Sequence, residues 1–115
     1  MEQNFVVSTE SGQVFGYDTR MPKDPIFRLD AHKKACSSVS FSPHINNMMA
    51  TVSVDQVVKV WDINVAAGEQ PKLISKKKPD QGELFSVRFY EDIPWVLAAG
   101  GSKGQLCIWD TEEDQ

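Results

Sequence analysis

The sequence predicts an all-β chain built from repeated units. Apolar and polar residues alternate in short runs, and no ten-residue segment shows the spacing of a helix. Three runs end on an aromatic residue followed by aspartate: Tyr17-Asp18, Trp61-Asp62 and Trp109-Asp110. The aspartates lie 44 and 48 residues apart, and the lead-ins GQVFGYD, QVVKVWD and GQLCIWD align without a gap. This regularity indicates one structural unit repeated along the chain.

Composition is that of a folded soluble chain. The 115 residues suit one small domain, with 41% hydrophobic and 24% charged residues. The net charge of -4 gives no overall attraction for nucleic acid. No apolar run reaches the roughly 18 to 20 residues of a membrane span, and the N-terminal residues lack the pattern of a signal peptide. We therefore expect an intracellular protein without a membrane segment.

The first unit is predicted over residues 5–29. The runs 5–9 and 12–18 are rich in β-forming residues, and a further short run at 26–29 follows a proline, as suits an edge strand. Between the first two runs, Glu10-Ser11-Gly12 is typical of a hairpin turn, because glycine tolerates positive φ. This unit has three predicted strands.

The second unit is predicted over residues 38–76 and has a fourth strand. Asp55-Gln56 provides its hairpin turn. Its predicted strands are 38–43, 48–53, 56–62 and 72–75.

The third unit is predicted over residues 84–110. Its strands are expected at 85–89, 95–99 and 104–110, with a glycine-rich hairpin turn at 101–104. The acidic residues after it, 111–115, are expected to form a solvated tail.

These units resemble the blades of the WD40 β-propeller family, which are four-stranded sheets arranged around a central channel. The resemblance implies that 5–29 are strands b to d of one blade, that 38–76 are a whole blade, and that 84–110 are strands a to c of a third. The expectation is therefore an all-β fragment of about 2.5 four-stranded blades from a seven-bladed propeller. Alone, such a fragment exposes blade faces and an unpaired edge.

The second unit carries the sharpest match to the family. Ala31-His32 stands where WD40 blades have Gly-His, and the resemblance implies a buried polar chain of His, Ser, Asp and Trp side chains. Such a chain stabilises only when every member is satisfied. The first and third units have Ser11 and Lys103 at the aspartate position, so we expect them to rely on hydrophobic packing. The implied structural tetrad is His32, Ser53, Asp55 and Trp61.

Two candidate interaction sites follow from the same resemblance. Lys33, Lys34 and the turn residue Val54 are expected on one face and form the candidate partner-binding site. The basic run Lys76-Lys77-Lys78 is expected in the loop between the second and third units, as the candidate RNA contact. A solvated loop without a ligand is the alternative for that run.

The sequence gives no pattern of catalysis or metal binding. His32 and Asp55 could form a catalytic base pair, but no nucleophile accompanies them at a recognisable spacing. The glycine-rich stretch 100–104 leads into a strand rather than a helix, unlike a phosphate loop. Cys36 and Cys107 lack metal-ligand spacing, and two buried thiols are favoured over one disulfide. We expect a non-enzyme with no cofactor, metal or small-molecule substrate.

Within the WD40 superfamily, the chain most resembles the periodic tryptophan protein 1 family, on residues 5–27 and 82–110. This resemblance implies a non-catalytic scaffold of nucleolar ribosome biogenesis, acting in large-subunit assembly and pre-rRNA processing. The implied partners are pre-ribosomal proteins, with a peripheral contact to pre-rRNA, and the implied location is the nucleus and nucleolus. The alternative is a generic WD40 adaptor in a chromatin, transcription or ubiquitin-ligase complex.

Overall fold

The computed structural model describes residues 4–20, 23–45, 47–64, 69–80, 82–93, 95–104 and 106–111. Within these residues, strands form three antiparallel sheets, each ordered as the strands follow one another in the chain. The first sheet contains β1 (Asn4–Ser8), β2 (Gln13–Asp18) and β3 (Phe27–Asp30). The second contains β4 (Cys36–Phe41), β5 (Met48–Ser53), β6 (Val58–Asp62) and β7 (Lys72–Lys77). The third contains β8 (Leu84–Phe89), β9 (Val96–Gly101) and β10 (Leu106–Asp110). The predicted all-β fold class is confirmed.

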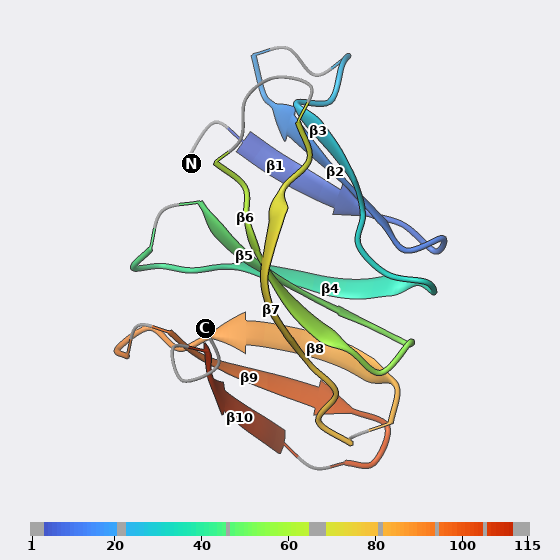
Figure 1. Cartoon of the computed structure of the whole chain (residues 1–115), viewed down its shortest axis with the longest axis vertical. Coiled ribbons are helices and arrows are strands. Elements are labelled where there is room, and N and C mark those ends of the chain that lie inside the picture. The colour runs from blue at the N-terminus through green and yellow to red at the C-terminus, as the bar shows by residue number, and fades with distance from the viewer. Residues whose placement is uncertain are drawn as a thin grey trace.

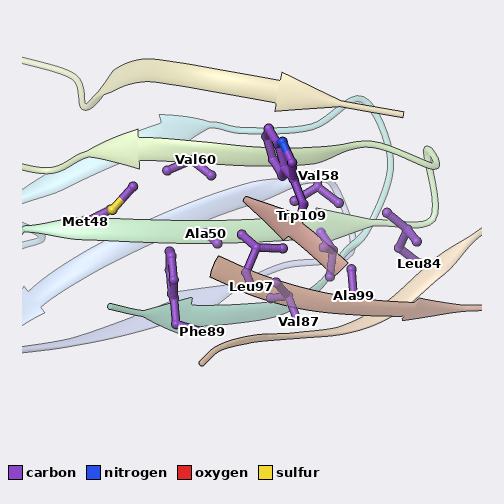
Figure 2. Close-up of a cluster of buried hydrophobic side chains, with 11 residues drawn as sticks. Met48, Ala50, Val58, Val60, Leu84, Val87, Phe89, Leu97, Ala99 and Trp109 are labelled. Carbon is purple, nitrogen blue, oxygen red and sulfur yellow. The ribbon is translucent and has the colours of Figure 1, made fainter. Parts of the chain in front are cut away.

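The three sheets are stacked along the longest axis of the molecule, with the second sheet between the other two (Figure 1). All six residues of β5 are buried, because both faces of this strand lie against neighbouring sheets. One core, between the first and second sheets, includes Val14, Met49 and Trp61. The other, between the second and third sheets, includes Val60 and Trp109, as Figure 2 shows.

The hairpin turns of the three sheets are copies of one geometry. Gly12, Gln56 and Gly104 have φ of 87°, 76° and 77°. In each turn the N–H of this residue donates to the carbonyl three residues earlier, at 3.1 Å. These are the positions that the gap-free alignment of the three lead-ins places together, so the structure repeats where the sequence does.

Several elements begin or end away from their predicted positions. β4 starts at Cys36, two residues before the predicted 38, and its pairing with β5 shifts between Cys36 and Ser38. Trp95, predicted as the first strand residue, precedes β9 and has a φ of 73°. Thr111, the first residue of the predicted acidic tail, is buried, and its N–H and hydroxyl both donate to the carbonyl of Trp95. The rest of that tail, 112–115, lies outside the described residues.

Candidate functional site

A buried chain of polar side chains joins the first and second sheets. The Trp61 indole Nε1–H donates to Thr51 Oγ1 at 3.0 Å. Thr51 Oγ1 lies 2.7 Å from His32 Nε2, and His32 Nδ1 lies 2.9 Å from Asp55 Oδ2. The His32 side chain is fully covered, whereas that of Asp55 is 11% exposed. The chain therefore runs from the inside of the core to its rim.

One protonation pattern satisfies every member of this chain. Thr51 already accepts from Trp61, so its own hydroxyl proton is free to donate to His32 Nε2. His32 then carries its proton on Nδ1 and donates it to Asp55, a tautomer assigned from the network. Burial lowers the pKa of His32, although Asp55 pulls it upward. The imidazole is therefore neutral near pH 7.

Tight turns and close backbone contacts hold His32 and Asp55 in place. The carbonyl of Gly12 accepts from the N–H groups of Ala31 and His32, at 3.1 and 3.0 Å. The carboxylate of Asp55 also accepts from the backbone N–H groups of Lys33 and Val57. The connection between β3 and β4 is thereby anchored to the hairpin turns on either side of it.

Thr51, not Ser53, supplies the hydroxyl of this chain, so the predicted tetrad is wrong at one position. Both residues point to the same face of β5, because side chains alternate along a strand. Trp61 pairs with Met49 of β5. Thr51 is the next residue after Met49 on that face, and Ser53 is the one after it, so Thr51 lies nearer to the Trp61 indole. The Ser53 hydroxyl instead donates to the carbonyl of Ala35 at 2.7 Å. The register of β5 against β6 decides which hydroxyl the indole reaches.

The equivalent positions in the first and third sheets have no matching chain. By the same alignment, Val7 and Ala99 correspond to Thr51. The residues at the aspartate position make other contacts: Ser11 bonds to Thr9, and Lys103 forms an exposed ion pair with Asp80 at 3.1 Å. Among the described residues, the His–Thr–Trp arrangement therefore belongs to the second sheet alone.

The candidate partner-binding residues lie together beside this chain. The N–H of Val54 donates to the carbonyl of Ala35, which places the turn after β5 next to the β3–β4 connection. Lys33 and Lys34 are exposed on that connection, and Val54 is half-buried. A half-buried apolar side chain is thus flanked by two lysines.

The basic run predicted in a loop lies largely in a strand instead. Lys76 and Lys77 are the last residues of β7, and Lys78 follows it. Pairing with β6 continues to the end of β7, where Lys77 is opposite Val58. Because Lys77 is opposite Val58, its side chain points to the same face as that of Val58, towards the third sheet. Its Nζ lies 5.8 Å from the ring centroid of Trp109 in that sheet. Lys76 therefore points to the opposite face, towards the first sheet.

The buried histidine is not arranged for acid–base catalysis. A hydroxyl, an imidazole and a carboxylate in this order also form a catalytic triad, but Thr51 is 0% exposed and its oxygen already accepts from the Trp61 indole, so a substrate cannot reach it. A hollow of about 350 Å³ lies between the second and third sheets. Its lining includes Ile74 and Trp95 but does not include His32. The His32–Asp55 pair thus has a structural role in this fold.

Cys36 and Cys107 are free thiols, and burial raises the pKa of Cys36 to about 11. Such a thiol stays protonated at neutral pH and is a poor nucleophile. In the described part of the chain, no group of three His, Cys, Asp or Glu side chains could hold a metal ion. No helix in that part is long and apolar enough to span a bilayer.

Comparison with known proteins identifies the repeat. Residues 23–62 match the WD40 family, described as "WD domain, G-beta repeat". This match covers the connection that carries His32 and the strands that carry Thr51 and Trp61. The segment from β3 through β6 is therefore a WD40 repeat.

Three relatives illustrate the range of proteins that the chain resembles. It is 35% identical over 96% of its length to an uncharacterized WD repeat-containing protein of Schizosaccharomyces pombe, covering 21% of that protein. It is 28% identical over 90% of its length to the Periodic tryptophan protein 1 homolog of Drosophila melanogaster, covering 22%. It is 33% identical over 96% of its length to Denticleless protein homolog B of Xenopus laevis, covering 15%. The chain spans about a fifth or less of the length of these relatives.

Proposed function

Because the chain carries a WD40 repeat within a stack of antiparallel sheets, we propose that it is a non-catalytic scaffold of ribosome biogenesis. In this role it holds proteins of large-subunit precursors together during pre-rRNA processing in the nucleolus. It uses no cofactor and no small-molecule substrate. The likeness to the Periodic tryptophan protein 1 homolog supports this proposal over the length of the chain.

The observation that carries the scaffold role is the state of His32. This histidine, with its aspartate, is the pair that an enzyme would use, yet it is buried and fully hydrogen-bonded. The buried polar side chains thus hold two sheets together. Binding specificity then belongs to exposed loops and turns, which a rigid repeat positions.

The proposed protein-binding site contains Lys33, Lys34 and Val54. An apolar side chain beside exposed lysines suits a partner that has an apolar anchor with acidic neighbours. Val54 is held in a turn whose backbone is fixed by Ala35, so little ordering is needed when a partner binds.

Affinity purification of the whole tagged protein from cells tests the proposal. We expect large-subunit precursor proteins to be captured, and Val54→Asp to reduce their yield several-fold. Ile93→Asp is the control, since it places the same charge on an apolar residue that is exposed and lies in the loop before β9, away from the half-buried Val54. Absence of ribosomal precursors from the captured proteins would contradict the proposal.

A second candidate is an adaptor in a chromatin, transcription or ubiquitin-ligase complex. Identity to the Denticleless homolog, 33%, exceeds the 28% to the Periodic tryptophan protein 1 homolog, and this supports keeping the candidate. The same purification separates the two, because an adaptor of this kind captures chromatin proteins or ligase subunits instead of ribosomal precursors.

A further inference from the structure

Two lysines face each other across neighbouring strands of the second sheet. In the pairing of β6 with β7, Lys59 is directly opposite Lys76. Partner residues of an antiparallel pair point to the same face, and like charges in this position destabilise the sheet. Lys59 and Trp61 share that face, since they are two residues apart on β6. The two side chains therefore leave the second sheet on the face towards the first sheet.

The connection from β3 to β4 places Lys33 near this pair of lysines. Lys59 Nζ donates to the carbonyl of Ala31 at 2.6 Å and lies 5.7 Å from the ring centroid of Trp61. These contacts hold its charge beside the connection that carries Lys33 and Lys34. Burial lowers the pKa of Lys59, and Lys76 and Lys33 lower it further, against the opposing effect of Asp55. The lysines are thus close enough to repel one another.

The neighbouring acidic side chain offsets only part of this positive charge, because one carboxylate lies beside several lysines and forms an ion pair with none of them. Asp55 is the carboxylate next to Lys59, and it already accepts from His32 and from the backbone N–H groups of Lys33 and Val57. Among the described residues, the ion pairs join Arg20 to Asp18, His32 to Asp55 and Lys103 to Asp80. None of them includes the lysines of this group, in a chain whose net charge is -4.

We propose that Lys33, Lys34, Lys59 and Lys76 form one surface that binds the phosphate backbone of RNA. We name it the lysine surface. It replaces the run of Lys76, Lys77 and Lys78 as the RNA contact, because Lys77 faces the third sheet. The inference rests on the proposed function only for the source of the RNA.

The composition of the lysine surface favours RNA over an acidic peptide. Peptide binding depends on apolar or aromatic anchors. Val54, the apolar residue beside Lys33 and Lys34, is half-buried and lies at that part of the lysine surface alone. Among the described residues, the large exposed apolar side chains are Phe5, Val7, Ile26, Leu73, Phe85, Tyr90, Ile93, Leu106 and Ile108, and none belongs to the lysine surface. Trp61, the aromatic residue beside Lys59, is buried and offers no ring face for stacking, so the lysines suit charge-based, sequence-independent contact with phosphates. The expected complex is therefore strongly dependent on salt.

Salt-dependent binding of a labelled single-stranded RNA to the whole protein tests this surface. Each phosphate contact contributes about 0.7 to the slope of log affinity against log salt. The triple variant Lys33→Gln, Lys34→Gln, Lys76→Gln should therefore reduce the slope by about 2 and weaken binding at least tenfold at low salt. Lys59 is left in place because its contacts with Ala31 and Trp61 support the fold.

The matched control is Lys23→Gln, Lys72→Gln, Lys77→Gln, which removes the same charge from exposed positions outside the surface. It should leave the slope within about 0.5 of wild type, and both triples should melt close to wild type. Equal losses in the two variants would overturn the proposal, since they indicate diffuse attraction to positive charge. Absence of RNA binding, or equal binding of a polyglutamate peptide, would also overturn it. Capture of ribosomal precursors by the wild-type protein would then show that only the surface assignment had failed.

Discussion

At the scale of single residues, the hydroxyl of Thr51 links two groups that lose their partners without it. Thr51→Val keeps the shape of the side chain but leaves the Trp61 N–H and His32 Nε2 unpaired inside the core. Each buried polar group without a partner costs roughly 1–3 kcal/mol, so we expect this variant to lose about 2 kcal/mol or more of stability in denaturant unfolding.

The Trp61 indole N–H resonance distinguishes this role from that of Ser53. It should shift in Thr51→Val and remain near its wild-type position in Ser53→Ala, although Ser53→Ala also loses its bond to Ala35. A shift confined to Ser53→Ala would contradict the assignment of Thr51 to the chain.

The buried imidazole also makes stability depend on pH. The pKa of His32 is lowered in the folded chain below the ordinary value of 6.5. The unfolded chain therefore takes up the proton first as pH falls, and this lowers the free energy of unfolding. We expect this contribution to be complete above about pH 6.5 and to be lost progressively as pH falls from there towards the folded pKa.

Unfolding free energies measured from pH 8 to pH 5 test this dependence. His44→Gln is the control, because His44 is the other histidine of the chain and lies exposed, outside the buried polar chain. His32→Gln should flatten the curve as well as lower overall stability. A curve that is equally steep in both variants would contradict the role of His32.

At the scale of elements, the turn before β2 is fixed by a close backbone approach. A Cβ atom at Gly12 would lie 2.1 Å from the carbonyl oxygen of His32, whereas one at Gly104 would meet nothing within 4 Å. Both glycines have positive φ, so alanine costs about 1–2 kcal/mol at either position. Gly12→Ala must also displace the His32 backbone, and we expect a loss of about 3 kcal/mol or more. Equal thermal destabilisation of the two variants would contradict this account.

The alternation of apolar residues was sufficient to predict the strands, but not the contacts between them. The all-β class and the aligned turns at Gly12, Gln56 and Gly104 follow from local patterns that the sequence carries directly. Thr51 and Ser53 lie two residues apart on one face, so alternation alone could not choose between them. The pairing of Lys59 with Lys76 depends on an irregularity between Val60 and Trp61, which shifts the register of β7 and has no sequence signal.

At the scale of the whole molecule, the two outer sheets present faces that the middle sheet buries. Leu106 and Ile108 align with Val58 and Val60. The valines are 1% and 0% exposed against the third sheet, whereas Leu106 and Ile108 are 65% and 61% exposed. At the other end, Tyr17 aligns with Trp61 and stacks on exposed Phe5, with ring centroids 5.2 Å apart. Each end therefore has the kind of apolar face on which another sheet packs in this fold.

These exposed faces predict that the 115-residue chain associates with itself. We expect an average mass above that of the monomer in sedimentation equilibrium, increasing with concentration. Leu106→Lys with Ile108→Lys should move the mass towards the monomer while changing stability by no more than about 0.5 kcal/mol, since both side chains are exposed. Val58→Lys with Val60→Lys, the same change at the aligned buried positions, should unfold the chain because it buries unpaired charge. A wild-type chain that stays monomeric at every concentration and melts sharply and reversibly would contradict the prediction, because its apolar faces would then be stable in water.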